Sequence, residues 1–198
     1  LDPATLAAPD ATIGFRDAGR FLEACVAETA CPAFGLLLGL KGSLDDLGML
    51  GQLMRRAPSL AQALADLTMH QVRHTSRAVT YLLKSSGDAY LGYAIYEPDM
   101  PGGRQAQMTA IGFGCRILAD LAGTVPSTVY FSFAAGDGEE TRLVRRSLPA
   151  PVEFDAPFSA LALPHAALAR PLPDGDVAER QALSHRLRDV WLASQPDL

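Results

Sequence analysis

Apolar residues recur at helical spacing through the first third of the chain. Over residues 12–30 they fall on one face of a helix that Pro32 ends. A further helix begins at Ser59, where Gln62 three residues later completes a capping box. Its apolar face consists of Leu60, Ala63, Leu64, Leu67 and Val72. The pattern therefore predicts a helical N-terminal third.

The period of the pattern changes from helical to alternating at Arg77. Residues 77–84 and 90–97 both alternate, and the turn Ser-Ser-Gly-Asp lies between them, which predicts a β-hairpin. A helix follows, and its apolar face consists of Met108, Ile111, Cys115, Leu118 and Ala122. Short strands are predicted within 128–133, 151–154 and 159–164.

A last helix begins after Asp176, and Glu179 stands three residues further on. Its apolar stripe consists of Leu183, Leu187, Val190 and Trp191. Such a stripe has to be covered. It either packs on its own domain or forms a two-fold symmetric dimer interface.

The order of these segments predicts an α+β fold, because the strands are grouped rather than alternating regularly with helices. We expect an antiparallel sheet covered by helices.

Composition and charge limit the classes of function that the chain can have. The chain has 198 residues, 48% hydrophobic content and a net charge of −5, which suit one globular domain and disfavour a nucleic-acid surface on these residues. Its 3 cysteines form no C-x-x-C pair, and a sparse, odd set fits a reducing cytoplasm. No apolar run approaches the roughly 20 residues that span a bilayer, so we expect a cytoplasmic protein without a membrane partner.

The segment Phe34–Ser43, FGLLLGLKGS, superficially resembles a phosphate-binding loop. A P-loop needs G-x-x-x-x-G-K-[ST], whereas here Leu40 separates Gly39 from Lys41, and Gly42 separates Lys41 from Ser43. Three leucines also fill the interior of the segment. We interpret its glycines as sites where the backbone packs closely against a neighbouring element.

The segment HQVRH, from His70 to His74, resembles the H-E-x-x-H motif of zinc proteases. Gln71 replaces the glutamate that acts as general base, and no third ligand is evident. No G-x-S-x-G nucleophile motif is present either. We therefore predict no catalytic residue, no bound metal and no cofactor, and a metal-binding or enzymatic domain using the two histidines remains the alternative.

Several tyrosines cluster on the predicted hairpin, and a sheet face that carries phenols can line a small-molecule pocket. We expect Tyr81, Tyr93 and Arg104 to supply the polar contacts to a ligand between sheet and helices.

Two groups of motifs resemble the arabinose-binding type of regulatory domain found in AraC/XylS-family transcription regulators. The N-terminal group is Phe34-Gly35, Gly39, Leu47-Gly48, Leu50-Gly51, Pro58-Ser59-Leu60 and Ala63-Leu64. The second group is Pro151-Val152, Phe154, Leu161, Leu168, Pro171-Leu172 and Asp176. The resemblance covers about residues 12–176.

The resemblance implies a domain that senses a small-molecule effector, forms a homodimer and controls an attached DNA-binding domain. We expect a leader over 1–11, a sensing domain over 12–175 and a linker or dimerisation helix over 176–198, with the family's helix-turn-helix domain absent from this chain. The helix-first order argues against the cupin barrel of the founding arabinose regulator, so the family label does not make the ligand a sugar. A purely structural dimerisation module is a further alternative.

Overall fold

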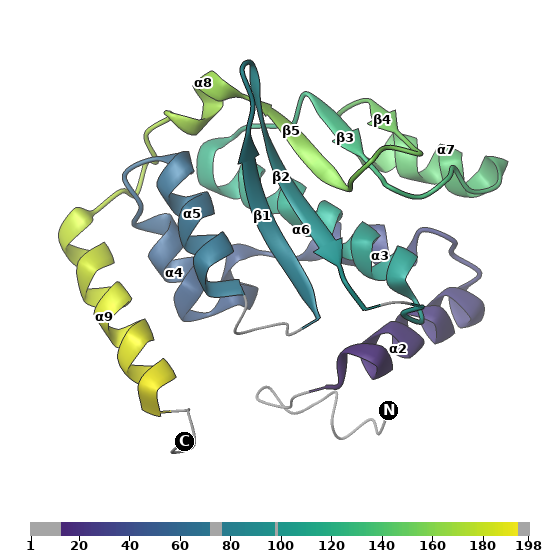
Figure 1. The fold of residues 1–198 in the computed structure, drawn as a ribbon, viewed down its shortest axis with the longest axis horizontal. Helices are drawn as coiled ribbons and strands as arrows, with labels where there is room; N and C mark the ends of the chain where they lie inside the picture. The colour runs from purple at the N-terminus through teal and green to yellow at the C-terminus, as the bar shows by residue number, and fades with distance from the viewer. Residues whose placement is uncertain (1–12, 72–76, 98, 194–198) are drawn as a thin grey trace.

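The computed structural model describes residues 13–71, 77–97 and 99–193, of which residues 191–193 are described by their backbone only. It has the expected α+β architecture, with one sheet and helices packed along it (Figure 1). In chain order the helical elements are α2 (Phe15–Thr29), α3 (Phe34–Lys41), the 3-10 turn η1 (Leu44–Leu47), α4 (Met49–Arg55), α5 (Leu60–His70), α6 (Gly103–Ala122), α7 (Gly138–Ser147), α8 (His165–Leu168) and α9 (Val177–Ala193).

The sheet has the strand order β1-β2-β5-β3-β4. Its strands are β1 (Ala78–Lys84), β2 (Asp88–Ile95), β3 (Thr128–Tyr130), β4 (Val152–Glu153) and β5 (Ala160–Pro164). The pairings β1–β2, β2–β5 and β5–β3 are antiparallel, as expected. The edge pair β3–β4 is parallel, because α7 carries the chain from one strand back to the start of the other. The sheet is thus antiparallel except at that edge.

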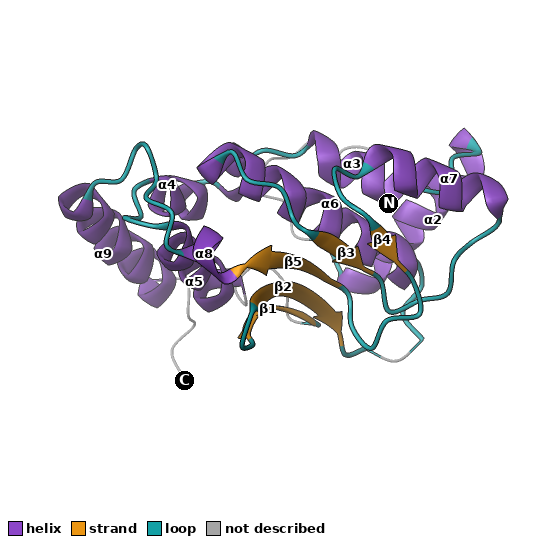
Figure 2. Ribbon diagram, turned by 90° about the horizontal axis from the view of Figure 1, so that it is seen from above, coloured by secondary structure: helices purple, strands orange, loops and turns teal. Residues whose placement is uncertain are grey.

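One face of the sheet is covered by helices (Figure 2). The long helix α6 crosses behind β2 and β5, α3 packs on α6, and α5 lies beside β1. The hydrophobic core lies between these layers and includes Leu36, Met108, Leu118, Val129 and Leu161, each at most 1% exposed.

The glycines of the Phe34–Ser43 segment bring the backbones of α3 and α6 together. A Cβ atom added to Gly35 would lie 2.2 Å from the carbonyl oxygen of Gln105, and one added to Gly39 would lie 2.1 Å from that of Thr109. On α6, a Cβ at Gly112 would lie 2.7 Å from the carbonyl oxygen of Leu36. Each position therefore excludes a side chain, which agrees with the packing role that the sequence suggested.

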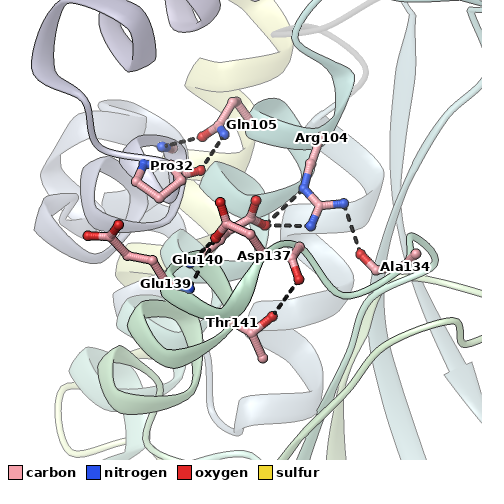
Figure 3. A network of polar contacts seen from close by, with 10 residues as sticks. Pro32, Arg104, Gln105, Ala134, Asp137, Glu139, Glu140 and Thr141 are labelled. Carbon is pink, nitrogen blue, oxygen red and sulfur yellow. Dashed lines mark hydrogen bonds and ion pairs between the residues drawn. The ribbon is translucent and has the colours of Figure 1, made fainter.

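A buried glutamine of α6 fixes the start of α3 (Figure 3). The side-chain oxygen of Gln105 accepts a hydrogen bond of 2.8 Å from the backbone N–H of Gly35. Its amide nitrogen donates to the carbonyl oxygen of Pro32, also at 2.8 Å. The first N–H groups of a helix lack partners within it, so one side chain both caps α3 and ties it to α6.

Most predicted segments match the structure, but helices α7 and α8 were not predicted. Ser59 accepts from the N–H of Gln62, and Asp176 accepts from that of Glu179, as their capping patterns indicated. Helix α7 falls between the strands predicted within 128–133 and 151–154, where no helix was predicted. Asp137 caps it by accepting from the N–H groups of Glu139 and Glu140, at 3.1 and 2.8 Å. The helix has only two large apolar residues, Leu143 and Val144, which are too few to mark an apolar stripe in the sequence.

We expect the substitution Gly39→Ala to destabilise the protein by about 3 kcal/mol, because the new methyl group would force the backbones of α3 and α6 apart. The matched control is Gly138→Ala in the first turn of α7, where an added Cβ has no neighbour within 4 Å. Urea unfolding of the two variants measures the difference. Equal midpoints for both would show that the helices do not depend on this contact.

Candidate functional site

A cavity of about 200 Å³ lies between α6 and the covered face of the sheet. Helix α6 contributes one wall, β1, β2 and β5 another, and η1 and α5 close one end. Its lining residues are Leu47, Leu67, Gln71, Thr80, Leu91, Gly92, Tyr93, Ala110, Ile111, Phe113, Gly114, Ile117 and Leu161. Most are apolar, and among these described residues none carries a charge. This is the usual composition of a small-molecule site, in which a few polar groups orient a ligand.

Strand register determines which hairpin residues face this cavity. Thr80 of β1 pairs with Tyr93 of β2, and Leu82 pairs with Leu91. Side chains alternate across a strand, so these four share the covered face.

The phenol of Tyr93 is only partly exposed. Burial, together with the charge of nearby Tyr96, raises the pKa of Tyr93 to about 12. At neutral pH the phenol is therefore protonated and can donate a hydrogen bond.

Gln71 brings a second polar group to the cavity. Its side-chain oxygen accepts a 2.7 Å hydrogen bond from the backbone N–H of Thr80. This bond joins the end of α5 to strand β1. The amide NH₂ of Gln71 and the hydroxyl of Thr80 complete the polar lining together with Tyr93.

A second hollow of about 470 Å³ adjoins the cavity on the side of α2 and α3. Tyr93, Ala110 and Phe113 line both spaces. Unlike the inner cavity, the second hollow has charged side chains in its lining, namely Lys41 and Asp46.

The structure places Tyr81 and Tyr93 on opposite faces of the hairpin. Tyr81 pairs with Gly92 on the face that the helices leave uncovered. Its ring covers Gly92, where an added Cβ would lie 2.1 Å from its Cζ atom. Burial raises the pKa of Tyr81 as well.

Arg104 lies apart from both tyrosines and joins α6 to α7 (Figure 3). Its guanidinium forms an ion pair with Glu140 and donates to the carbonyl oxygen of Ala134 at 3.0 Å. It also stacks 4.0 Å above the ring centre of Phe133. The structure thus does not bring the three expected ligand contacts together: Tyr93 borders the cavity, whereas Tyr81 and Arg104 do not.

Of the two histidines in HQVRH, only His70 lies within the described residues. It is the last residue of α5 and is 9% exposed, whereas His74 lies outside the described part of the chain. Within that part, no group of three His, Cys, Asp or Glu side chains is arranged to hold a metal ion. The absence of a metal at the histidine pair stays a prediction.

The apolar stripe of α9 is divided between core and surface. Leu183 is 7% exposed and belongs to the core, and Leu187 packs against it. Val190 is 58% exposed. Trp191 lies in the helix, and the structure describes only its backbone.

A buried ion pair holds α9 on the domain. Both oxygens of Asp66 on α5 accept hydrogen bonds from the guanidinium of Arg180, at 3.0 and 2.5 Å. The side chain of Asp66 is 4% exposed, and Gln62 donates a further bond to it at 3.1 Å. Near the start of α9, Glu179 pairs with Arg56 at 2.8 Å.

Comparison with known proteins identifies the family. The sequence model described as the arabinose-binding domain of AraC transcription regulators, N-terminal, matches residues 1–172. The chain belongs to this family.

A sequence relative supports the assignment to transcription regulators, and a solved structure shows the same fold. The chain is 26% identical over 182 residues to the HTH-type transcriptional regulator VirS of Mycobacterium tuberculosis, covering 90% of the chain and 53% of that protein. It therefore spans about half the length of the curated relatives it matches. The crystal structure of the transcriptional regulator CdpR from Pseudomonas aeruginosa has the same fold, with a TM-score of 0.67 and 16% identity over 90% of this chain and 66% of that one.

No single helix in the described part of the chain is long and apolar enough to cross a membrane. Helices α2 and α3 reach that length and hydropathy only when taken together across a bend of 108°.

The raised pKa of Tyr93 predicts a pH dependence of stability. An unfolded chain ionises this phenol near pH 10, whereas the folded protein holds its proton to about pH 12. Unfolding above pH 10 therefore releases a proton, and the free energy of unfolding falls as the pH rises from 10 to 12. We expect Tyr93→Phe to remove part of this alkaline loss, and Tyr90→Phe on the other sheet face to leave it unchanged. Urea unfolding at pH 9 and pH 11 measures both, and parallel pH profiles of Tyr93→Phe and the parent would contradict the assignment.

Proposed function

We propose that this regulatory domain senses a small-molecule effector in the cavity between α6 and the sheet, and passes the signal to an attached DNA-binding domain through α9. The observation that carries the proposal is the position of α5. This helix closes one end of the cavity with Leu67 and Gln71. One residue before Leu67, Asp66 holds α9 through Arg180.

A ligand can influence α9 only if it has different affinities for two arrangements of the domain. Helix α5 can couple ligand binding in the cavity to the position of α9, because it contacts both. A ligand that packs against Leu67 and Gln71 favours one placement of α5, and that placement sets where Asp66 meets Arg180. Asp66 and Leu67 of α5, together with Gln71 directly after it, thus connect the cavity with α9 over a few residues. DNA contacts are then made by another part of the full-length regulator.

Loss of the Asp66–Arg180 pair should loosen α9. We expect Arg180→Gln to lower the free energy of unfolding by about 3 kcal/mol, because it leaves a buried carboxylate without its ionic partner. Arg186→Gln, at an exposed position of the same helix, is the matched control and should change stability by less than about 0.5 kcal/mol. Chemical unfolding measures both. If the two variants lose equal stability, the ion pair does not anchor α9.

A ligand screen tests the sensing function itself. Sugars, amino acids, fatty acids and small aromatic compounds are added singly, and the midpoint of thermal unfolding is recorded for the parent chain and for Ala110→Leu. The new side chain would occupy the inner cavity, which Ala110 lines. Sensing at this site predicts at least one compound class that stabilises the parent and not the variant. Stabilisation by none of them would leave a structural module as the better account.

We also propose that the outer end of α9 takes part in a homodimer. The side chain of Val190 is exposed at this end, whereas those of Leu183 and Leu187 pack on the domain. A symmetric pair of α9 helices would cover this end of the stripe.

Val190→Glu should accordingly convert a dimer into a folded monomer, because the new charge would be buried without a partner in the interface. Asp189→Lys, at the neighbouring exposed position, serves as a control that changes charge without placing it on the stripe. Sedimentation velocity gives the oligomeric state. A Val190→Glu protein that stays dimeric would remove this part of α9 from the interface.

A further inference from the structure

We propose that the inner cavity takes an uncharged, compact and mostly apolar molecule about the size of one substituted ring, and not a sugar. This inference rests on the proposal that the cavity is the sensing site, and it specifies the chemical class of the effector.

The size of the cavity limits the ligand. Its volume is about 200 Å³, and an apolar protein cavity of about 150 Å³ holds one benzene molecule. The available space thus suits a single ring with one short substituent. A larger ligand would have to extend past Tyr93, Ala110 and Phe113 into the adjoining hollow.

The lining also disfavours a charged ligand. None of the described side chains around the cavity is ionised at neutral pH. A carboxylate or ammonium group placed there would lose its hydration without meeting an opposite charge, which is strongly unfavourable. The charged side chains in the two linings, Lys41 and Asp46, both belong to the second hollow.

The polar groups of the cavity are too few for a sugar. Gln71, Thr80 and Tyr93 provide them, and the side-chain oxygen of Gln71 is already bonded to the N–H of Thr80. A pentose carries several hydroxyls, each of which both donates and accepts. Every hydroxyl left unpaired in an apolar site weakens binding, so an aldopentose would bind poorly. A ligand with one carbonyl or ether oxygen needs one donor, and the Tyr93 hydroxyl can serve as that donor.

The test compares three probes of similar size: acetophenone, benzoate and L-arabinose. Acetophenone and benzoate both carry a ring and a carbonyl oxygen, and they differ in charge. At a concentration ten times its Kd, acetophenone should raise the unfolding temperature of this chain by roughly 3–6 °C. Benzoate and arabinose should bind at least about tenfold more weakly by titration calorimetry.

Variants locate the binding site. Tyr93→Phe should weaken acetophenone binding about tenfold, because it removes the donor to the carbonyl oxygen. Ala110→Leu should abolish binding by filling the space. Tyr81→Phe, a matched change on the uncovered sheet face, should leave the Kd unchanged. Tyr93 and Ala110 line both spaces, so two further variants decide between them. Gln71→Leu alters only the inner cavity and should weaken acetophenone binding, whereas Lys41→Gln alters only the second hollow and should leave the Kd unchanged.

Two results would overturn the ligand class while leaving the sensing function intact. One is arabinose binding that is tighter than acetophenone binding and is lost in Ala110→Leu. The other is benzoate binding that is tighter than acetophenone binding and is lost in Lys41→Gln, which would place an anionic ligand in the second hollow. Acetophenone binding unaffected by Ala110→Leu and Tyr93→Phe would also contradict the proposal. If no compound of the broader screen and none of the three probes binds, the proposed sensing function is contradicted as well.

Discussion

The direct contact between the backbones of α3 and α6 is the constraint on which the rest of the domain depends. Glycines allow the two helix backbones to approach closely, and an added methyl group at Gly35 or Gly39 would overlap a carbonyl oxygen of α6. Gln105 then ties the first turn of α3 to the same helix. Close packing and a buried hydrogen bond therefore fix α6 from the side that faces away from the sheet.

The position of α6 in turn sets the dimensions of the cavity. Five of the lining residues, Ala110, Ile111, Phe113, Gly114 and Ile117, come from this helix. The strands form the opposite wall, and their register places Thr80 across from Tyr93. Because α3 holds α6 rigidly, a ligand has more freedom to move the third wall, α5. That helix is the one that carries Asp66, and we infer that it links the cavity to α9.

Much of the architecture could be predicted from local sequence signals. The hairpin followed from alternation around a glycine-containing turn, and the starts of α5 and α9 followed from Ser59 and Asp176. These signals act over a few residues, so the sequence reveals them directly. Helix α7 was missed although Asp137 caps it in the same way, because its mostly polar sequence offers too few apolar residues to mark a helix after the cap.

The candidate site was less accessible to sequence reasoning. Tyr81 and Tyr93 both stood in β-rich segments, but only the pairing of Tyr81 with Gly92 shows that they lie on opposite faces. Arg104 had a partner 36 positions away, Glu140, which no local pattern indicates. Asp66 and Arg180 are 114 positions apart and were missed for the same reason. Long-range pairing decides which polar groups remain available to a ligand.

Hydrogen–deuterium exchange along α5 and α9, with and without acetophenone, tests most directly whether the cavity communicates with the C-terminal helix. The account predicts that ligand slows exchange in the cavity walls, in α5 and in α9 from Arg180 onward, and that Arg180→Gln removes the effect on α9 alone. Slower exchange confined to α6 and the strands, with α9 unchanged, would contradict it.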